Sequence, residues 1–136
     1  MYFEHVGLSC KDIETQVAFY RDLLKLTVRQ HEKTADGATV YILDAQGGGG
    51  MELIHRPEMV NLPARLLPDD EVGVRHFCFA VENMKELHAF LTGKGIEFTV
   101  EPRPPKVMKE ATSVAFCKDP EGNLVEFIEK KPHVGK

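Results

Sequence analysis

The chain contains an internal repeat in which two histidines and two glutamates occupy matching positions. The segment FEHVGL at residues 3–8 corresponds to VRHFCF at residues 74–79, and GMELI at residues 50–54 corresponds to LVEFI at residues 124–128. With the histidines aligned, a three-residue insertion in the second copy brings the two glutamates into register. A repeat of this kind indicates two copies of one supersecondary unit.

The first copy predicts one strand, one helix and three further strands. Asp12 is suited to cap the start of the helix, because the apolar residues that follow it have helical spacing; these are Ile13, Val17, Tyr20 and Leu24. The strands are expected at residues 3–8, 26–30, 39–43 and 51–55. The glycine run at residues 47–50 is expected to form the turn before the last strand.

The second copy predicts the same order of elements. Its first strand, at residues 76–81, has large apolar side chains at alternate positions. Asn83 with Glu86 three residues later forms a capping box at the start of a helix, which ends at Gly93 or Gly95. Further strands are expected at residues 97–100, 113–117 and 124–129, with a turn at residues 119–122.

The predicted fold class is therefore α+β, with two βαβββ modules forming a cupped mixed β-sheet. The modules span residues 1–56 and 74–131, and residues 57–73 read as a proline-containing, acidic linker with a short helical turn. At 136 residues the whole chain, 1–136, is expected to be a single domain that buries a core without disulfides.

Composition excludes several classes of partner. A net charge of −4, with scattered basic residues, argues against nucleic acid or an anionic membrane as the main partner. No apolar run is long enough to span a bilayer, and the charged first 20 residues are unlike a signal peptide. The three cysteines form no CxxC pair, so we expect reduced thiols in a cytoplasmic protein.

The two glutamates are the most informative residues because they lie among apolar neighbours. Glu126 is in the segment NLVEFI, and Glu52 is flanked by Met51 and Leu53. A buried carboxylate is costly unless it is paired, protonated or bound to a metal. A single strand glutamate usually faces solvent or pairs with arginine, and a single core histidine usually bonds a carbonyl. The same residue types at equivalent positions in both copies favour metal binding over these alternatives.

We therefore predict that His5, Glu52, His76 and Glu126 bind one divalent metal. Two carboxylates balance the charge of the ion, and two imidazoles add neutral nitrogen donors. The absence of a thiolate leaves coordination positions for water or substrate, which is typical of a catalytic site. Ni²⁺, Co²⁺, Zn²⁺, Mn²⁺ and Fe²⁺ all fit this donor set.

Several motifs resemble those of the vicinal oxygen chelate superfamily, the glyoxalase/bleomycin resistance protein/dioxygenase group. They are HVGL at 5–8 leading into Asp12-Ile13, FYRDLL at 19–24, MEL at 51–53, HFCF at 76–79 and DPEGNLVE at 119–126. The last is the most specific, and together they cover nearly the whole chain. Within the superfamily the chain looks most like glyoxalase I, the lactoylglutathione lyase.

The resemblance implies a glyoxalase-like cupped sheet around the metal, with substrate oxygens chelating the ion. It implies a lyase or isomerase that moves a proton next to a carbonyl through a metal-chelated enediolate. Glu126, with Glu52 opposite it, is then the acid and base that carries the proton. The partners it implies are a small-molecule substrate and a second copy of the chain, as a homodimer that pairs modules within or across chains.

The substrate stays open at this stage. Family members that use glutathione hold it with an arginine and an asparagine, where this chain has Ser9 and Arg56. The alternatives are a thiol adduct, as in glyoxalase I, or a CoA thioester, as in methylmalonyl-CoA epimerase, which normally has glutamine where this chain has Glu52. An antibiotic-binding resistance protein is a third alternative, although such proteins lack the metal ligands.

Other residues say less about function. We expect His31, His55, His88 and His133 to be surface or helix-face residues rather than ligands. Cys78 shares a strand face with His76 and either lines the site or is a buried inert thiol. The basic loop at residues 103–109 either covers the site and holds an anionic substrate group or is simply solvated.

Overall fold

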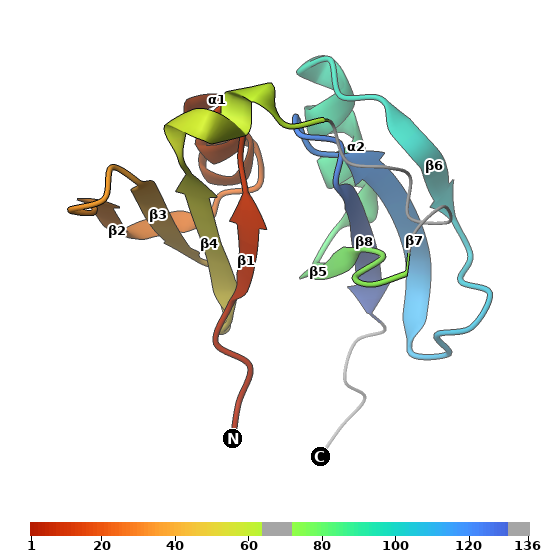
Figure 1. Cartoon of the computed structure of the whole chain (residues 1–136). Coiled ribbons are helices and arrows are strands. Elements are labelled where there is room, and N and C mark those ends of the chain that lie inside the picture. Colours follow the sequence, from red (N-terminus) through yellow and green to blue (C-terminus); the bar gives the residue numbers. More distant parts are fainter. Residues whose placement is uncertain (64–71, 131–136) are drawn as a thin grey trace. The chain divides into compact units, whose positions relative to one another are not determined.

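The computed structural model describes residues 1–63 and 72–130 and divides the chain into two compact units (Figure 1). The first unit spans Met1–Ala64 and the second spans Arg65–Lys136. Each contains a βαβββ module, and each is described here by itself. The predicted α+β fold with two βαβββ modules is confirmed.

The first unit contains a four-stranded mixed sheet and a helical segment. Its elements are β1 (Val6–Ser9), α1 (Ile13–Ala18), the π-helix η1 (Phe19–Leu23), β2 (Thr27–Lys33), β3 (Thr39–Asp44), β4 (Gly50–His55) and the 3-10 helix η2 (Pro57–Asn61). The strand order is β1-β4-β3-β2. β1 runs parallel to β4, and the other neighbouring strands are antiparallel.

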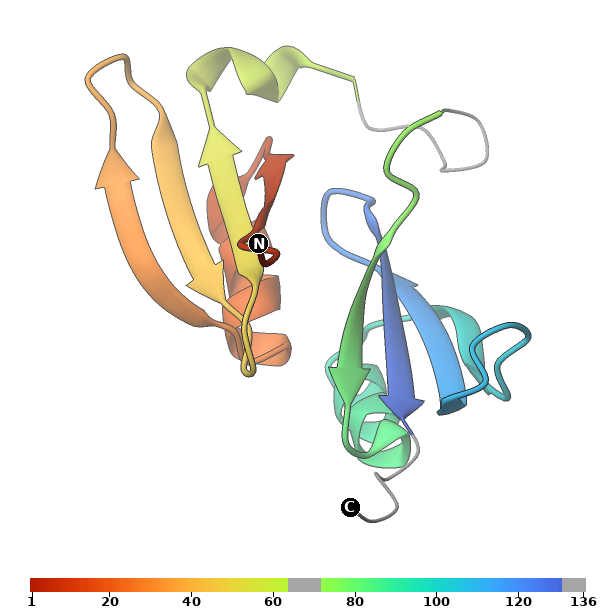
Figure 2. The same ribbon diagram turned by 90° about the horizontal axis from the view of Figure 1, so that it is seen from below.

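The second unit repeats this topology. Its elements are β5 (Phe77–Val81), α2 (Met84–Gly93), β6 (Phe98–Arg103), β7 (Ala111–Lys118) and β8 (Leu124–Lys130). The strand order is β5-β8-β7-β6, with β5 parallel to β8 and the other neighbours antiparallel. A view from below shows each helix with the sheet of its own unit (Figure 2).

Both predicted helix caps are present. The Asp12 side chain accepts a hydrogen bond from the Thr15 N–H at 3.2 Å, and the Asn83 side chain accepts one from the Glu86 N–H at 3.1 Å. These bonds satisfy backbone donors that the first helical turn leaves without a partner. The first helix differs from a regular α-helix, because after Ala18 it widens into π-helix η1, in which the Leu24 N–H donates to the Phe19 carbonyl.

The core of each unit lies between its helix and one face of its sheet. In the first unit, Met51 and Leu53 point into this core and are fully buried. In the second unit, Val125 and Phe127 do the same. Because side chains alternate along a strand, the residue between each pair, Glu52 or Glu126, points to the opposite face. We call this opposite face of each sheet the helix-free face.

The segment between the modules is only partly described. The helical turn expected there is η2, which begins at Pro57, the first proline of the segment. Residues 64–71 lie outside the described residues, as does His133 near the end of the chain. No helix in the described parts is long and apolar enough to cross a membrane.

Candidate functional site

The same strand pairing places a histidine and a glutamate together in each unit. Gly7 of β1 is the partner of Glu52 on β4, and Cys78 of β5 is the partner of Glu126 on β8. In each unit the histidine is two residues before that partner. We expected both histidines to lie inside a strand, but His5 and His76 each precede the first strand residue by one position. Strand ends are the least well-defined part of an element.

In the second unit, His76 and Glu126 are close neighbours. The His76 Nε2 atom lies 3.8 Å from Glu126 Oε1, and the Glu126 side chain is only 15% exposed. The Phe116 ring packs edge-on against the imidazole with a centroid distance of 5.5 Å. Two donor atoms that each lie about 2.1 Å from one ion can be at most about 4.2 Å apart. The pair therefore meets this geometric requirement for a shared metal.

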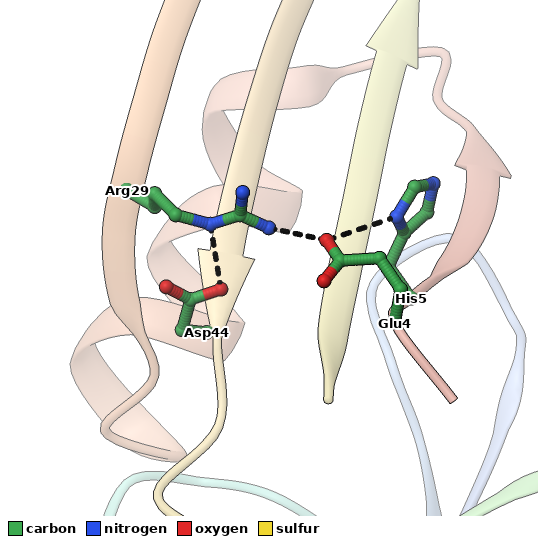
Figure 3. A network of polar contacts seen from close by, with 4 residues as sticks. All are labelled: Glu4, His5, Arg29 and Asp44. Carbon is green, nitrogen blue, oxygen red and sulfur yellow. Dashed lines mark hydrogen bonds and ion pairs between the residues drawn. The ribbon is translucent and has the colours of Figure 1, made fainter. Parts of the chain in front are cut away.

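In the first unit, Glu52 and His5 have different surroundings. The Glu52 carboxylate lies over Gly7, where a side-chain carbon would come 3.7 Å from Oε1. No Lys or Arg in the described residues forms an ion pair with Glu52 or with Glu126. His5 contacts Glu4 instead of Glu52, with 3.4 Å between Nδ1 and Glu4 Oε1 (Figure 3).

Cys78 distinguishes the second unit from the first, which has Gly7 at the equivalent position. The Cys78 residue is exposed on the sheet surface with its sulfur atom only partly covered, so the alternative of a thiol in the buried core is wrong. Burial of the sulfur atom, then the hydrogen bond to Glu126 and its charge, raise the pKa of this thiol well above its usual range. The Cys78 thiol donates to the Phe79 carbonyl oxygen, with 3.9 Å between Sγ and O. Glu126 therefore has a neighbouring thiol where Glu52 has Gly7.

Each unit taken alone contains only two of the four predicted ligands. Within either unit, the described residues include no group of three or more His, Cys, Asp or Glu side chains that could hold a metal ion. Each helix-free face offers one imidazole nitrogen and one carboxylate oxygen from the predicted set. This donor chemistry fits a divalent ion that needs ligands from two modules.

The other described histidines have structural partners. His31 stacks on Tyr41, and His55 Nδ1 lies 2.8 Å from the Cys10 carbonyl oxygen. His88 lies on α2, where its Nε2 atom is 2.5 Å from a Glu101 carboxylate oxygen. Each of the three therefore has a local contact that accounts for its position.

The basic loop after β6 partly covers the helix-free face of the second sheet. Met108 packs against a small buried cluster that contains Val114 and Ile128. Ile128 is two residues from Glu126 on the same strand and shares its face. Met108 of the loop therefore contacts this face two residues along β8 from Glu126. Arg103 donates to the neighbouring Pro104 carbonyl.

The family of the chain follows from its sequence. The profile of the Glyoxalase/Bleomycin resistance protein/Dioxygenase superfamily matches residues 2–127, so the chain belongs to this superfamily. The superfamily resemblance inferred from the motifs is thereby confirmed. No curated protein sequence matches the chain significantly.

Solved structures of similar fold include a glyoxalase family protein and two glyoxalase I proteins from different organisms. A glyoxalase family protein from Enterococcus faecalis has a TM-score of 0.74 at 24% identity, and the match covers 95% of this chain and 96% of that one. The trypanothione-dependent glyoxalase I of Leishmania major has a TM-score of 0.72 at 20% identity, with 95% and 86% covered. A glyoxalase I mutant from Zea mays has a TM-score of 0.75 at 21% identity, with 93% of this chain and 44% of that one covered. At these identities the likeness concerns the fold.

Proposed function

We propose that the chain is a metal-dependent lyase or isomerase of the glyoxalase I type, which moves a proton next to a carbonyl group. The observation that carries this proposal is the repeated His–Glu arrangement on the helix-free face of each module. Membership of the superfamily supports it. Solved structures with this fold include glyoxalase I of Leishmania major and of Zea mays.

In this proposal His5, Glu52, His76 and Glu126 hold the divalent ion. The ion, Ni²⁺, Co²⁺, Zn²⁺, Mn²⁺ or Fe²⁺, would stabilise the negative charge that develops on substrate oxygen when the adjacent carbon loses its proton. Glu126 takes and returns that proton, with Glu52 as its counterpart. Phe116 supports the His76 ring edge-on, which restricts the imidazole.

The substrate we propose is a hemithioacetal, as for lactoylglutathione lyase. Ser9 and Arg56 replace the glutathione-holding residues, and the Arg56 guanidinium is already paired with Asp36 at 2.5 Å. We therefore leave open which thiol forms the hemithioacetal. The glyoxalase I of Leishmania major, for example, depends on trypanothione. The loss of the residues that hold glutathione also favours a second candidate function, the epimerisation of a CoA thioester. Antibiotic binding without catalysis is a third and weaker alternative.

The proposal also includes a homodimer and a cytoplasmic location. Two modules with half a metal site each can complete it within one chain or across two. The three cysteines form no disulfide in the described structure, which suits a reducing compartment. Sedimentation at micromolar concentration tests the assembly; a monomer that binds metal fully would contradict ligands shared between chains.

Incubation with two substrates tests the function. Metal-loaded protein is given the hemithioacetal of methylglyoxal and glutathione and, separately, methylmalonyl-CoA. We expect turnover of the first, because the four ligands match the lyase set. Turnover of only the second would establish the epimerase, and antibiotic binding without turnover of either would contradict an enzyme of this type.

A further inference from the structure

In the first unit, Glu4 lies between Arg29 and His5, which is a predicted metal ligand (Figure 3). The Arg29 Nη2 atom donates to Glu4 Oε1 at 2.6 Å, and Arg29 Nε donates to Asp44 Oδ1 at 2.9 Å. The His5 Nδ1 atom is 3.4 Å from the same Glu4 oxygen. A connected series of polar contacts therefore runs from Asp44 through Arg29 and Glu4 to the imidazole of His5.

A bulge in β2 brings Arg29 into this network. Val28 is paired with Leu43 and Gln30 with Ile42 on the neighbouring strand, so Arg29 is the extra residue. Such a bulge redirects a side chain relative to the regular alternation of the strand. Arg29 reaches both Asp44, the last residue of β3, and Glu4, which precedes β1 by two residues.

The hydrogen-bond partners of Glu4 determine what it does to the imidazole. The Arg29 guanidinium offers only donors, so Glu4 Oε1, which lies 2.6 Å from Arg29 Nη2, acts as an acceptor. A hydrogen bond from His5 to the same oxygen requires the proton on Nδ1, which leaves the lone pair on Nε2. Metal-binding histidines commonly have their second nitrogen held in this way.

We propose that Glu4, anchored by Arg29, is a positioning residue that holds His5 with Nδ1 protonated and Nε2 ready to bind a divalent metal. This inference rests on the proposed function, because it takes His5 to be a ligand. In the described part of the second unit, the neighbour of the His76 Nδ1 atom is the Arg75 guanidinium, at 3.4 Å, instead of a carboxylate.

The tautomer of His5 tests the inference without any metal. Imidazole ¹⁵N chemical shifts are measured on metal-free protein at a pH well above the ordinary histidine pKa of about 6.5. In the wild type we expect the Nδ1–H form of His5 to predominate. In Glu4→Ala the signal should move towards the Nε2–H form that an unconstrained imidazole prefers. Glu32→Ala removes another exposed glutamate of the same unit and should leave the signal unchanged.

Metal affinity tests the consequence. Titration with Zn²⁺ should show that Glu4→Ala weakens binding by roughly 10- to 100-fold, the usual effect of losing a residue that supports a ligand. Glu4→Gln keeps an oxygen that accepts from Nδ1–H, so it should restore part of the affinity. Arg29→Met, which frees Glu4 from its anchor, should weaken binding less than Glu4→Ala. Thermal unfolding of each variant establishes that it is folded.

The outcomes separate this inference from the proposed function. A wild-type protein that binds no metal would overturn both. If the wild type binds metal while Glu4→Ala keeps the wild-type tautomer and affinity, the role of Glu4 alone is overturned. A loss of affinity in Glu4→Ala with no change in the His5 signal would show that Glu4 binds the ion itself, and it would also overturn a positioning role.

Discussion

At the scale of single residues, the two glutamates of the candidate site are equivalent in the repeat but differ in their neighbours. Glu126 lies beside the Cys78 thiol and 3.8 Å from His76, whereas Glu52 lies over Gly7 and has no ion pair among the described residues. Their roles in proton transfer therefore have to be separated by substitution.

Replacing Glu126 by Gln tests its role as the proton carrier. The amide keeps the size of the side chain and one oxygen ligand but cannot accept a proton. We expect a modest loss of metal affinity and a fall in turnover of roughly a hundredfold or more, the usual contribution of a general base. The measurement is turnover of the active substrate with metal restored, with Glu52→Gln as the matched variant. Near wild-type turnover in Glu126→Gln would reverse the two roles.

At the scale of elements, local sequence determined much of what could be predicted. The caps Asp12 and Asn83 act within three residues of themselves. The alternation of Met51, Glu52 and Leu53 likewise places the glutamate on the face opposite the core. These features depend on neighbours in the chain, so periodicity and capping rules found them.

Replacing Asn83 by Ala tests the cap of α2. The side chain accepts from the Glu86 N–H, so its loss leaves a backbone donor at the helix start without this partner. We expect a loss of about 1 kcal/mol in the free energy of unfolding, measured by denaturant titration. The control is Glu82→Ala, which alters the exposed residue before the cap. Equal stability of the two variants would contradict the capping role.

The network around Glu4 could not be predicted in the same way. It needs the bulge at Arg29 and the pairing of β2 with β3, which bring residues 25 and 15 positions apart into contact. Nothing in the local sequence distinguishes Arg29 from other exposed strand arginines. The exposure of Cys78 could not be predicted either, because alternation gives the face on which a side chain lies but not how much of that face other residues cover.

At the scale of the whole molecule, the internal repeat accounts for both the fold and the candidate site. Each βαβββ module buries one face of its sheet beneath a helix and presents a histidine and a glutamate on the other. Neither module supplies three ligands from its described residues. The predicted four-ligand metal site would therefore need both modules.

Metal content is the most direct measurement of that claim. Protein purified without chelators is analysed by elemental analysis, and Zn²⁺ affinity is then measured for the wild type, His5→Ala and His76→Ala, which remove one ligand from each module. We predict roughly one ion per chain in the wild type. In each variant we predict a loss of affinity larger than the 10- to 100-fold typical of a supporting residue. Equal metal content and affinity in the wild type and both variants would contradict a site built by the two modules together.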